Sequence, residues 1–356
     1  MALALSLGRR GMGRVWPNPA VGCVIVQAGR IVGRGWTADG GRPHAETQAL
    51  AQAGIGARGA TAYVTLEPCA HHGKTPPCAE ALIAAGVARV VVATGDPDPR
   101  VAGRGIAVLQ HAGIAVEIGL MADEAQGDLR GFLRRVTTGR PMLTLKLAAS
   151  LDGRIATASG ESQWITGPEA RRAVHLLRAR HDAVMVGAGT ARADDPLLSV
   201  RGLGIDRQPV RVVVARSLDL PRAGQLAASA AITPLWLCHG PNASAEAVAF
   251  WTAQGATCLT GAENSGQIAP DSVMTALGDR GLTRVFCEGG GALAASLLRA
   301  GLVDELVVFA AGVMIGSEGL PALGPMGLDR LSDAPRFVLR AVLPIGPDVM
   351  QVWSRA

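Results

Sequence analysis

The feature that most constrains this chain is a set of histidine, glutamate and cysteine residues between positions 44 and 78. Pro43-His44-Ala45-Glu46 is followed by Glu67-Pro68-Cys69 and then by Cys78. One imidazole and two thiolates suit Zn²⁺, and three protein ligands leave its fourth position open for catalysis. A chain with this pattern must fold so that three separate segments meet at one metal ion.

The role of Glu46 is indicated by its distance from His44. Glu46 lies two residues after His44, and this spacing does not stack two ligands on a helix as four residues would. We therefore interpret Glu46 as a non-ligand that transfers protons between water and a departing amine. The pattern matches the His-x-Glu and Pro-Cys signature of zinc deaminases. It predicts removal of an exocyclic amino group from a pyrimidine-type ring.

The spacing of the two cysteines departs from that signature, because eight residues separate them instead of two. A longer loop can still close on one metal ion, and His71, His72 and Lys74 are candidates to line a pocket. A structural zinc site is the alternative, with His71 or His72 as the fourth ligand. That alternative leaves Glu46 without a role, so the sequence favours catalysis.

Short β-rich segments alternate with helical ones, which predicts an α/β fold class. Leu3 and Leu7 indicate an amphipathic helix at the start. The polar segment 134–141 predicts a boundary between one domain of residues 1–140 and another of residues 141–356. In the first domain we expect a hairpin of residues 20–27 and 30–36, strands at 61–66 and 89–94, and helices at 44–53, 78–86 and 105–111.

In the second domain the same alternation predicts another sheet, of mixed strand direction. Thr166-Gly-Pro-Glu169 has the form of a capping box, with Thr166 as the N-cap of a helix over 168–180. Strands are expected at 142–148, 182–186, 211–214, 235–238, 284–287 and 306–310, and as a pair within 337–353.

Composition restricts the partners. The formal net charge of +5 suggests an anionic ligand, and a small phosphorylated substrate satisfies it. Five Phe, six Trp and one Tyr are few for stacking bases, so we expect no nucleic acid. With no apolar stretch long enough to cross a bilayer and no targeting segment, we expect no membrane partner and a cytoplasmic location. A homo-oligomer is compatible with the sequence.

Several longer segments of the chain are characteristic of one family. They are PNPAVGCVIV (17–26), PHAE (43–46), TAYVTLEPCAHHGKTPPC (61–78), DPDPRVAGRGI (96–106), LKLAASLDGRIATASGESQWITGPEARR (145–172), ADDPLLSVR (193–201) and EGGGALAASLL (288–298). Together they closely resemble the bifunctional deaminase/reductases of riboflavin biosynthesis. The resemblance covers essentially the whole chain, and the long gap between the cysteines is itself typical of the family. It implies an N-terminal cytidine-deaminase-like α/β/α domain followed by a dihydrofolate-reductase-like α/β domain.

The resemblance implies two consecutive reactions. The first domain would deaminate 2,5-diamino-6-ribosylamino-4(3H)-pyrimidinone 5′-phosphate, with Zn²⁺ on His44, Cys69 and Cys78 and with Glu46 as proton shuttle. The second would reduce the ribosyl chain with NADPH, which gives 5-amino-6-ribitylaminouracil 5′-phosphate. A deaminase whose reductase half is inactive is the alternative.

The resemblance also assigns residues of the second domain to ligands. The glycine run 289–291 stands between a strand and a helix, where backbone amides can approach a phosphate. Contacts with substrate are implied for Ser162, Arg178, Leu198, Arg201 and Glu288. Contacts with the cofactor are implied for Ala148, Trp164, Thr190, Asp194, Gly290, Gly291, Ala292, Leu293, Ala294, Ala295 and Ser296.

Three departures from the family pattern are present. Thr37 stands where a histidine is common, so one pocket contact is lost or moved. Ala70 stands where a serine is usual after the first cysteine, which should be tolerated. Ala215-Arg216 replaces a common Asp-Ser pair near the cofactor, and Arg216 either favours the 2′-phosphate of NADPH or points to solvent. Lys146 and Asp152 are further candidates for reductase chemistry, and the sequence does not separate catalytic from structural roles for them.

Overall fold

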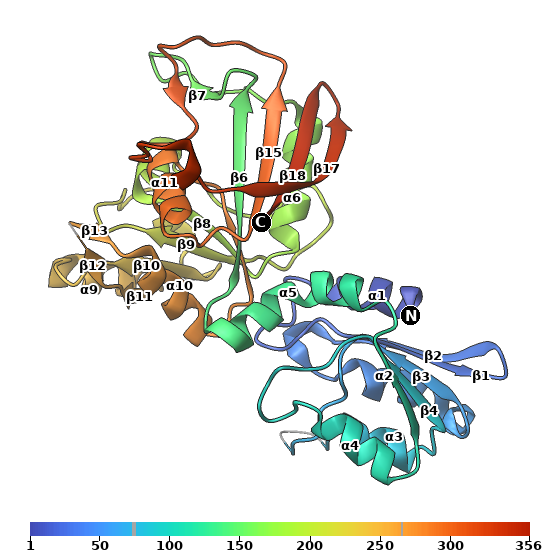
Figure 1. The fold of residues 1–356 in the computed structure, drawn as a ribbon. Coiled ribbons are helices and arrows are strands. Elements are labelled where there is room, and N and C mark those ends of the chain that lie inside the picture. The colour runs from blue at the N-terminus through green and yellow to red at the C-terminus, as the bar shows by residue number, and fades with distance from the viewer. Residues whose placement is uncertain (73–75, 265) are drawn as a thin grey trace. The chain divides into compact units, whose positions relative to one another are not determined.

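The structure, a computed structural model, describes residues 1–72, 76–264 and 266–356. The chain divides into two compact units (Figure 1). Met1–Arg140 with Gly281–Thr283 forms the first unit, and Pro141–Arg280 with Arg284–Ala356 forms the second.

The first unit is a sheet between two layers of helices (Figure 1). Its strands have the order β2-β1-β3-β4-β5, with β1 antiparallel to β2 and β3 and the others parallel. Helices α1 and α5 cover one face, and α2, α3 and α4 cover the other. The elements are α1 Ala2–Gly8, β1 Gly22–Gln27, β2 Arg30–Trp36, α2 Ala45–Ala53, β3 Thr61–Val64, α3 Cys78–Ala84, β4 Arg89–Val92, α4 Arg104–His111, β5 Ala115–Ile118 and α5 Ala122–Thr138.

The second unit is built on a larger sheet with the strand order β11-β10-β9-β8-β14-β6-β15-β18-β17. Strands β11 to β15 in this order are parallel, and the hairpin of β17 and β18 adds antiparallel strands at one edge. The sheet is therefore mixed, as the sequence predicts. Its strands are β6 Met142–Ser150, β8 Ala183–Gly187, β9 Val210–Val214, β10 Leu235–His239, β11 Thr257–Thr260, β14 Arg284–Cys287, β15 Glu305–Ala311, β17 Phe337–Ile345 and β18 Asp348–Arg355.

Helices flank this sheet, and two short strand pairs lie apart from it. Helix α6 packs on Val307 and Phe309 of β15, while α8 and α9 pack beside β8, β9 and β10. The helices are α6 Pro168–Ala179, α7 Ala188–Asp194, α8 Gln225–Ser229, α9 Ala245–Ala253, α10 Pro270–Asp279 and α11 Gly291–Arg299. The short pairs are β7 Arg154–Ala156 with β16 Leu320–Pro321, and β12 Glu263–Asn264 with β13 Gln267–Ile268.

Each expected strand and helix is present, but two local predictions are wrong. Helix α6 starts at Pro168 with Gly167 as N-cap, and the amide of Gly167 donates to Asp348 instead of Thr166 forming a capping box. The polar segment 134–141 contains the end of α5 at Thr138 and the division between the units after Arg140. In α1, Leu7 is buried but Leu3 is 39% exposed, so these two leucines do not share a buried face.

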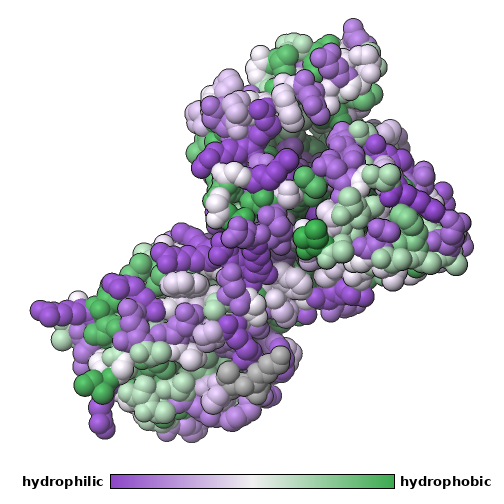
Figure 2. Space-filling model, turned by 180° about the vertical axis from the view of Figure 1, so that it is seen from behind, coloured by the Kyte–Doolittle hydropathy of each residue, from purple (hydrophilic) through white to green (hydrophobic). Residues whose placement is uncertain are grey.

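On the face shown in Figure 2, hydrophilic and hydrophobic side chains alternate over the surface of both units. Among the described residues, every helix is too short or too polar to cross a membrane.

Candidate active sites

The metal-ligating side chains predicted in the first unit come together. The Nδ1 atom of His44 lies 3.3 Å from the Sγ atom of Cys78 and 3.7 Å from that of Cys69, and all three ligand atoms lie within 4.8 Å of one another. Ligands of a tetrahedral zinc ion are separated by about 3.5–3.8 Å, given the usual Zn–N and Zn–S bond lengths. Both the donor set and the spacing therefore fit Zn²⁺.

Helix α2 carries His44 and Glu46 because it packs directly on the sheet. Gly35 of β2 faces the helix, and a Cβ atom there would lie 2.1 Å from the carbonyl oxygen of Ala45. Only glycine permits this approach. His44 is the N-cap of α2, and Glu46 stands in its first turn. Backbone packing thus holds the imidazole at the helix start with the glutamate beside it.

The cysteine loop is held by Glu67. One carboxylate oxygen of Glu67 accepts hydrogen bonds from the amides of Gly105 and Ile106, and the other from those of Asp96 and Gly103. These amides belong to the start of α4 and the loop before it, where helix amides lack intrahelical acceptors. A buried carboxylate therefore joins the Cys69 loop to α4. Sequence reasoning noticed this glutamate but gave it no role.

The two cysteines lie against each other, and the amide of Cys78 donates a hydrogen bond to the sulfur of Cys69 at 3.3 Å. Interaction with the Cys78 side chain, ahead of that with His44, lowers the pKa of Cys69 to about 4. The neighbouring Cys69 side chain, together with burial, raises the pKa of Cys78 well above its ordinary value. A divalent cation at this position would favour the thiolate form of both cysteines, because coordinated thiols are deprotonated.

Glu46 is the buried acid of the site. Its side chain is 4% exposed, and burial raises its pKa to about 7, with a further contribution from the negative charge of Cys69. It does not belong to the cluster of candidate metal ligands in the described residues. A carboxyl group with this pKa can both accept and release a proton near neutral pH.

Other residues predicted around this site have different surroundings. His72 lies 3.4 Å from Glu80, and neither it nor His71 joins the candidate ligand cluster in the described part of the chain. Lys74 lies outside the described residues. Thr37 is buried, accepts a hydrogen bond from the amide of Val21 and donates one to the carbonyl of Pro19. The threonine hydroxyl therefore has a structural role.

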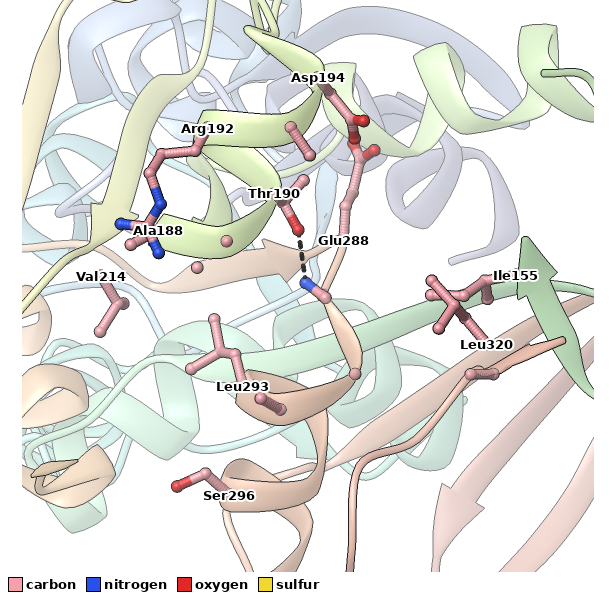
Figure 3. Close-up of a pocket in the computed structure, with 18 of the residues that line it drawn as sticks. Ile155, Ala188, Thr190, Arg192, Asp194, Val214, Glu288, Leu293, Ser296 and Leu320 are labelled. Carbon is pink, nitrogen blue, oxygen red and sulfur yellow. Dashed lines mark hydrogen bonds between the residues drawn. The ribbon is translucent and has the colours of Figure 1, made fainter. Parts of the chain in front are cut away.

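The second unit contains a cleft of about 840 Å³ at the carboxyl ends of its parallel strands (Figure 3). Gly187 ends β8, Val214 ends β9 and Glu288 follows β14, and all three line it. Strand β14 enters the sheet between β8 and β6, although it comes later in the sequence than β9 to β11. The strand order thus reverses here, and open α/β sheets bind their ligands at such a point.

Charged side chains form one wall of the cleft. Arg178 binds Glu288 with two hydrogen bonds, of 2.5 and 2.9 Å, and each of these side chains is 12% exposed. Burial would raise the pKa of Glu288, but Arg178 and Lys146 together lower it. Burial lowers the pKa of Lys146, and Glu288 opposes this. Lys146 and Glu288 both line the cleft.

Asp152 has a different role from Lys146. Its carboxylate accepts hydrogen bonds from the hydroxyl of Ser150 and from the amides of Ile315 and Gly316, and these bonds lower its pKa to about 2. Asp152 does not line the cleft among the described residues. It is therefore a loop anchor, whereas Lys146 is available to a ligand.

The start of α11 presents free backbone donors to the cleft. The amide of Gly290 donates to the hydroxyl of Thr190 (Figure 3). The amides of Gly291, Ala292 and Leu293 have no acceptor in the described part of the chain, and these residues line the cleft. Unpaired amides at a helix N-terminus bind phosphate groups. The glycine run therefore fits a phosphate group of a nucleotide cofactor.

The cleft gathers most, but not all, of the predicted reductase residues. Ala148, Ser162, Thr190, Asp194, Glu288, Gly290, Gly291, Ala292, Leu293 and Ser296 line it. Ala294 and Ala295 are buried in α11, and Leu198 is buried elsewhere in the unit. The indole of Trp164 is 69% exposed and stacks on Arg171, while Arg178 is occupied by Glu288 and Arg201 lies outside the lining. Sequence reasoning missed Arg192, Ser217 and Asp219 in the lining.

Comparison with known proteins places both units. Residues 1–94 match the model of the cytidine and deoxycytidylate deaminase zinc-binding region, and residues 141–351 match that of the RibD C-terminal domain. The riboflavin biosynthesis protein RibD of Escherichia coli is 47% identical, over 98% of this chain and 96% of its own length. That of Bacillus amyloliquefaciens is 40% identical, over 98% and 94%.

Solved structures agree along the whole chain. Acinetobacter baumannii RibD (form 2) superposes with a TM-score of 0.88 at 39% identity, covering 100% of this chain and 97% of that one. A diaminohydroxyphosphoribosylaminopyrimidine deaminase/5-amino-6-(5-phosphoribosylamino)uracil reductase from Thermotoga maritima superposes with a TM-score of 0.87 at 33% identity, with the same coverage.

The fold and the two sites define an enzyme with two activities, a deaminase with a His/Cys/Cys zinc-binding region and a reductase that implies a nucleotide cofactor. The chain belongs to the RibD family, the bifunctional deaminase/reductases of riboflavin biosynthesis.

Proposed function

We propose that the first unit deaminates 2,5-diamino-6-ribosylamino-4(3H)-pyrimidinone 5′-phosphate, with Zn²⁺ held by His44, Cys69 and Cys78. Zinc, when bound, supplies the Lewis acidity that makes water a nucleophile near neutral pH. The proposal is supported by the three ligand atoms within 4.8 Å of one another, next to a buried glutamate outside the ligand set.

Glu46 moves the protons of this reaction. Its carboxylate accepts a proton from the attacking water and delivers it to the departing amine, so that ammonia leaves and a ring carbonyl forms. A pKa of about 7 suits both directions of transfer. Burial excludes bulk water, which would otherwise compete for the proton.

The second unit is proposed to reduce the ribosyl chain of the deaminated product to ribityl, with NADPH in the cleft. NADPH, when bound, supplies the hydride. Lys146 would donate the accompanying proton to the sugar oxygen, and this role is supported by its position in the cleft lining with Glu288 and by burial, which lowers its pKa. The free amides at the start of α11 would hold the diphosphate. The product would be 5-amino-6-ribitylaminouracil 5′-phosphate.

Three further expectations stay predictions. They are a cytoplasmic location, the absence of nucleic-acid and membrane partners, and assembly as a homo-oligomer. Arg201, Leu198 and Ser162 stay proposed substrate contacts, and Ala294, Ala295 and Trp164 proposed cofactor contacts.

The decisive experiment supplies the purified protein with the diaminopyrimidinone phosphate and follows ammonia release and NADPH oxidation in the same sample. We expect ammonia first and NADPH oxidation after it. A second sample receives the deaminated intermediate directly. Ammonia release without any NADPH oxidation in either sample would contradict the reductase activity while leaving the deaminase in place.

Glu46→Gln separates proton transfer from metal binding. The variant should keep its zinc, measured by metal analysis, but lose about 10²- to 10⁴-fold in ammonia release, the usual contribution of a general acid–base group. Its oxidation of NADPH on the supplied intermediate should be unchanged, which serves as the internal control. Deamination at the parent rate would refute the proton-shuttle role.

A further inference from the structure

Two arginines from different elements meet the cleft of the second unit at one end. Arg192 belongs to α7, and Arg216 follows β9; both line the cleft together with Ser217. Figure 3 shows Arg192 beside Ala188 and Val214, on the opposite side of the drawn pocket from Ile155 and Leu320. The cleft therefore has a cationic end.

The guanidinium groups at this end differ in what they already bind. Arg192 donates to the carbonyl oxygen of Asp219 at 2.8 Å and lies 3.5 Å from its carboxylate, so its position is fixed while other donors stay unused. Arg216 is exposed, and its guanidinium group makes no hydrogen bond or ion pair within the described residues. An arginine without a protein partner in a cleft is a ready site for an anion.

The carboxylates near these two arginines leave room for an anionic ligand at this end of the cleft. Asp219 stands on the rim, and its side chain is largely exposed. Glu263 lies beside the stem of Arg216 where both approach Gly240, but Glu263 does not line the cleft in the described part of the chain. Two guanidinium groups thus line the cleft, and the carboxylate of Asp219, which also lines it, is paired with Arg192.

The order of groups along the cleft indicates which anion fits. Lys146 and Glu288 stand where reduction is proposed, and the free amides of Gly291 and Ala292 suit a diphosphate. A dinucleotide that follows this order presents its adenosine half at the remaining end. Guanidinium forks bind a phosphate dianion through charge-assisted hydrogen bonds, whereas a ribose hydroxyl offers no charge to match.

We propose that Arg216, positioned with Arg192, binds the 2′-phosphate of the adenosine ribose and makes this site select NADPH over NADH. The inference rests on the proposed function, that the cleft binds a nicotinamide dinucleotide. It also gives a role to the Ala215-Arg216 sequence that departs from the family pattern. Arg216 is here a specificity-determining residue and takes no part in hydride transfer.

Equilibrium binding tests this without turnover. Titration of the full-length protein, followed by calorimetry, gives dissociation constants for NADPH, NADH, adenosine 2′,5′-bisphosphate and AMP. Arg216→Gln should weaken NADPH and the bisphosphate by about 10- to 100-fold, the range of a charged hydrogen-bond pair. It should leave NADH and AMP within about twofold of the parent, since neither carries the 2′-phosphate. The affinity of Arg216→Lys for NADPH should lie between those of the parent and Arg216→Gln, because lysine keeps the positive charge but lacks the two parallel donors of a guanidinium group.

Arg222→Gln is the matched control, since this exposed arginine of the same unit pairs with Glu246 and lies outside the cleft lining. It should change none of the four constants. An equal loss of NADPH and NADH in Arg216→Gln would overturn the selectivity role. Equal affinity of the parent for both dinucleotides would overturn it too, while leaving a dinucleotide reductase intact. Failure of the parent to bind either dinucleotide would instead refute the proposed function.

Discussion

The two sites of this chain differ in how their functional groups are held. In the first unit, three ligand atoms lie within 4.8 Å of one another, and α2 and the cysteine loop place them by direct backbone packing. In the second unit, a cleft of about 840 Å³ draws its lining from the ends of several strands and from two helices. The first site depends on a few atoms, and the second spreads its contacts over many residues.

This difference predicts different responses to substitution. Removing one metal ligand eliminates one of the three protein atoms that would coordinate the metal ion, and no neighbouring sulfur atom among the described residues can replace it. Removing one cleft residue changes only part of a distributed surface, unless that residue is a buried charge whose partner is then left uncompensated.

Cys78→Ser tests the dependence on a few atoms. Zinc content should fall, and ammonia release should drop by about 10³-fold or more, because activation of water requires the metal. NADPH oxidation on the supplied intermediate should persist. Cys258→Ser, which removes a half-buried thiol of the second unit, is the control and should retain both zinc and activity. Full zinc occupancy in Cys78→Ser would show that a loop histidine is the true third ligand.

Glu288→Gln tests the case of a buried charge in the cleft whose partners are left uncompensated. Loss of this carboxylate leaves Arg178 and Lys146 as adjacent buried cations, so the second unit should lose about 3 kcal/mol of unfolding free energy. Denaturant titration measures it. Glu246→Gln, which breaks the exposed pair with Arg222, should cost about 1 kcal/mol or less. Equal losses in the two variants would mean that the Arg178 pair behaves as a surface pair.

His181 gives the second unit a pH-dependent stability. It is buried, bonded to the carbonyl of Leu177 and to the hydroxyl of Thr144, and burial lowers its pKa to about 3. Because the unfolded chain takes up a proton near pH 6.5 and the folded one does not, stability is full above that pH and falls as pH decreases. The loss between pH 7 and pH 5 should be about 2 kcal/mol.

Hydrogen exchange of peptides from β6 and α6 at the two pH values measures this loss. His181→Gln should flatten the pH dependence of exchange. His111 makes the same bond to the carbonyl four residues earlier but is exposed, so His111→Gln is the matched control and should change nothing. A pH dependence that survives in His181→Gln would assign it to other groups.

Trp164→Ala should have the smallest effect. The indole is exposed and stacks 4.4 Å from the guanidinium carbon of Arg171, so its removal should cost less than about 1 kcal/mol of unfolding free energy. Affinity for NADPH, measured by calorimetry, should change by less than about tenfold, as for one partly exposed aromatic contact. A larger loss of affinity would show that Trp164 contacts the cofactor directly. Binding in the second site would then depend on fewer residues.

The sequence allowed most of the fold to be predicted, since the periodicity of apolar residues and the turn signals are local. The hairpin of β1 and β2, the helix after His44 and the C-terminal hairpin are confirmed. The capping box at Thr166 was wrong because Asp348, far away in sequence, binds the helix start instead. The extent of α5 to Thr138 was not predicted, because the polar end of a helix and a linker have similar composition.

The zinc site illustrates what the sequence determined by itself. The order of imidazole, carboxylate and thiols predicted a zinc-binding deaminase region and a role for Glu46 outside the ligand set, because ligand chemistry depends on residue type. Tertiary structure alone decided that Glu67 holds the cysteine loop, that Glu288 already binds Arg178, and that Arg192 and Arg216 meet at one end of the cleft. Those contacts depend on which segments, far apart in the sequence, pack together in the fold. No local pattern of residues shows which segments these are.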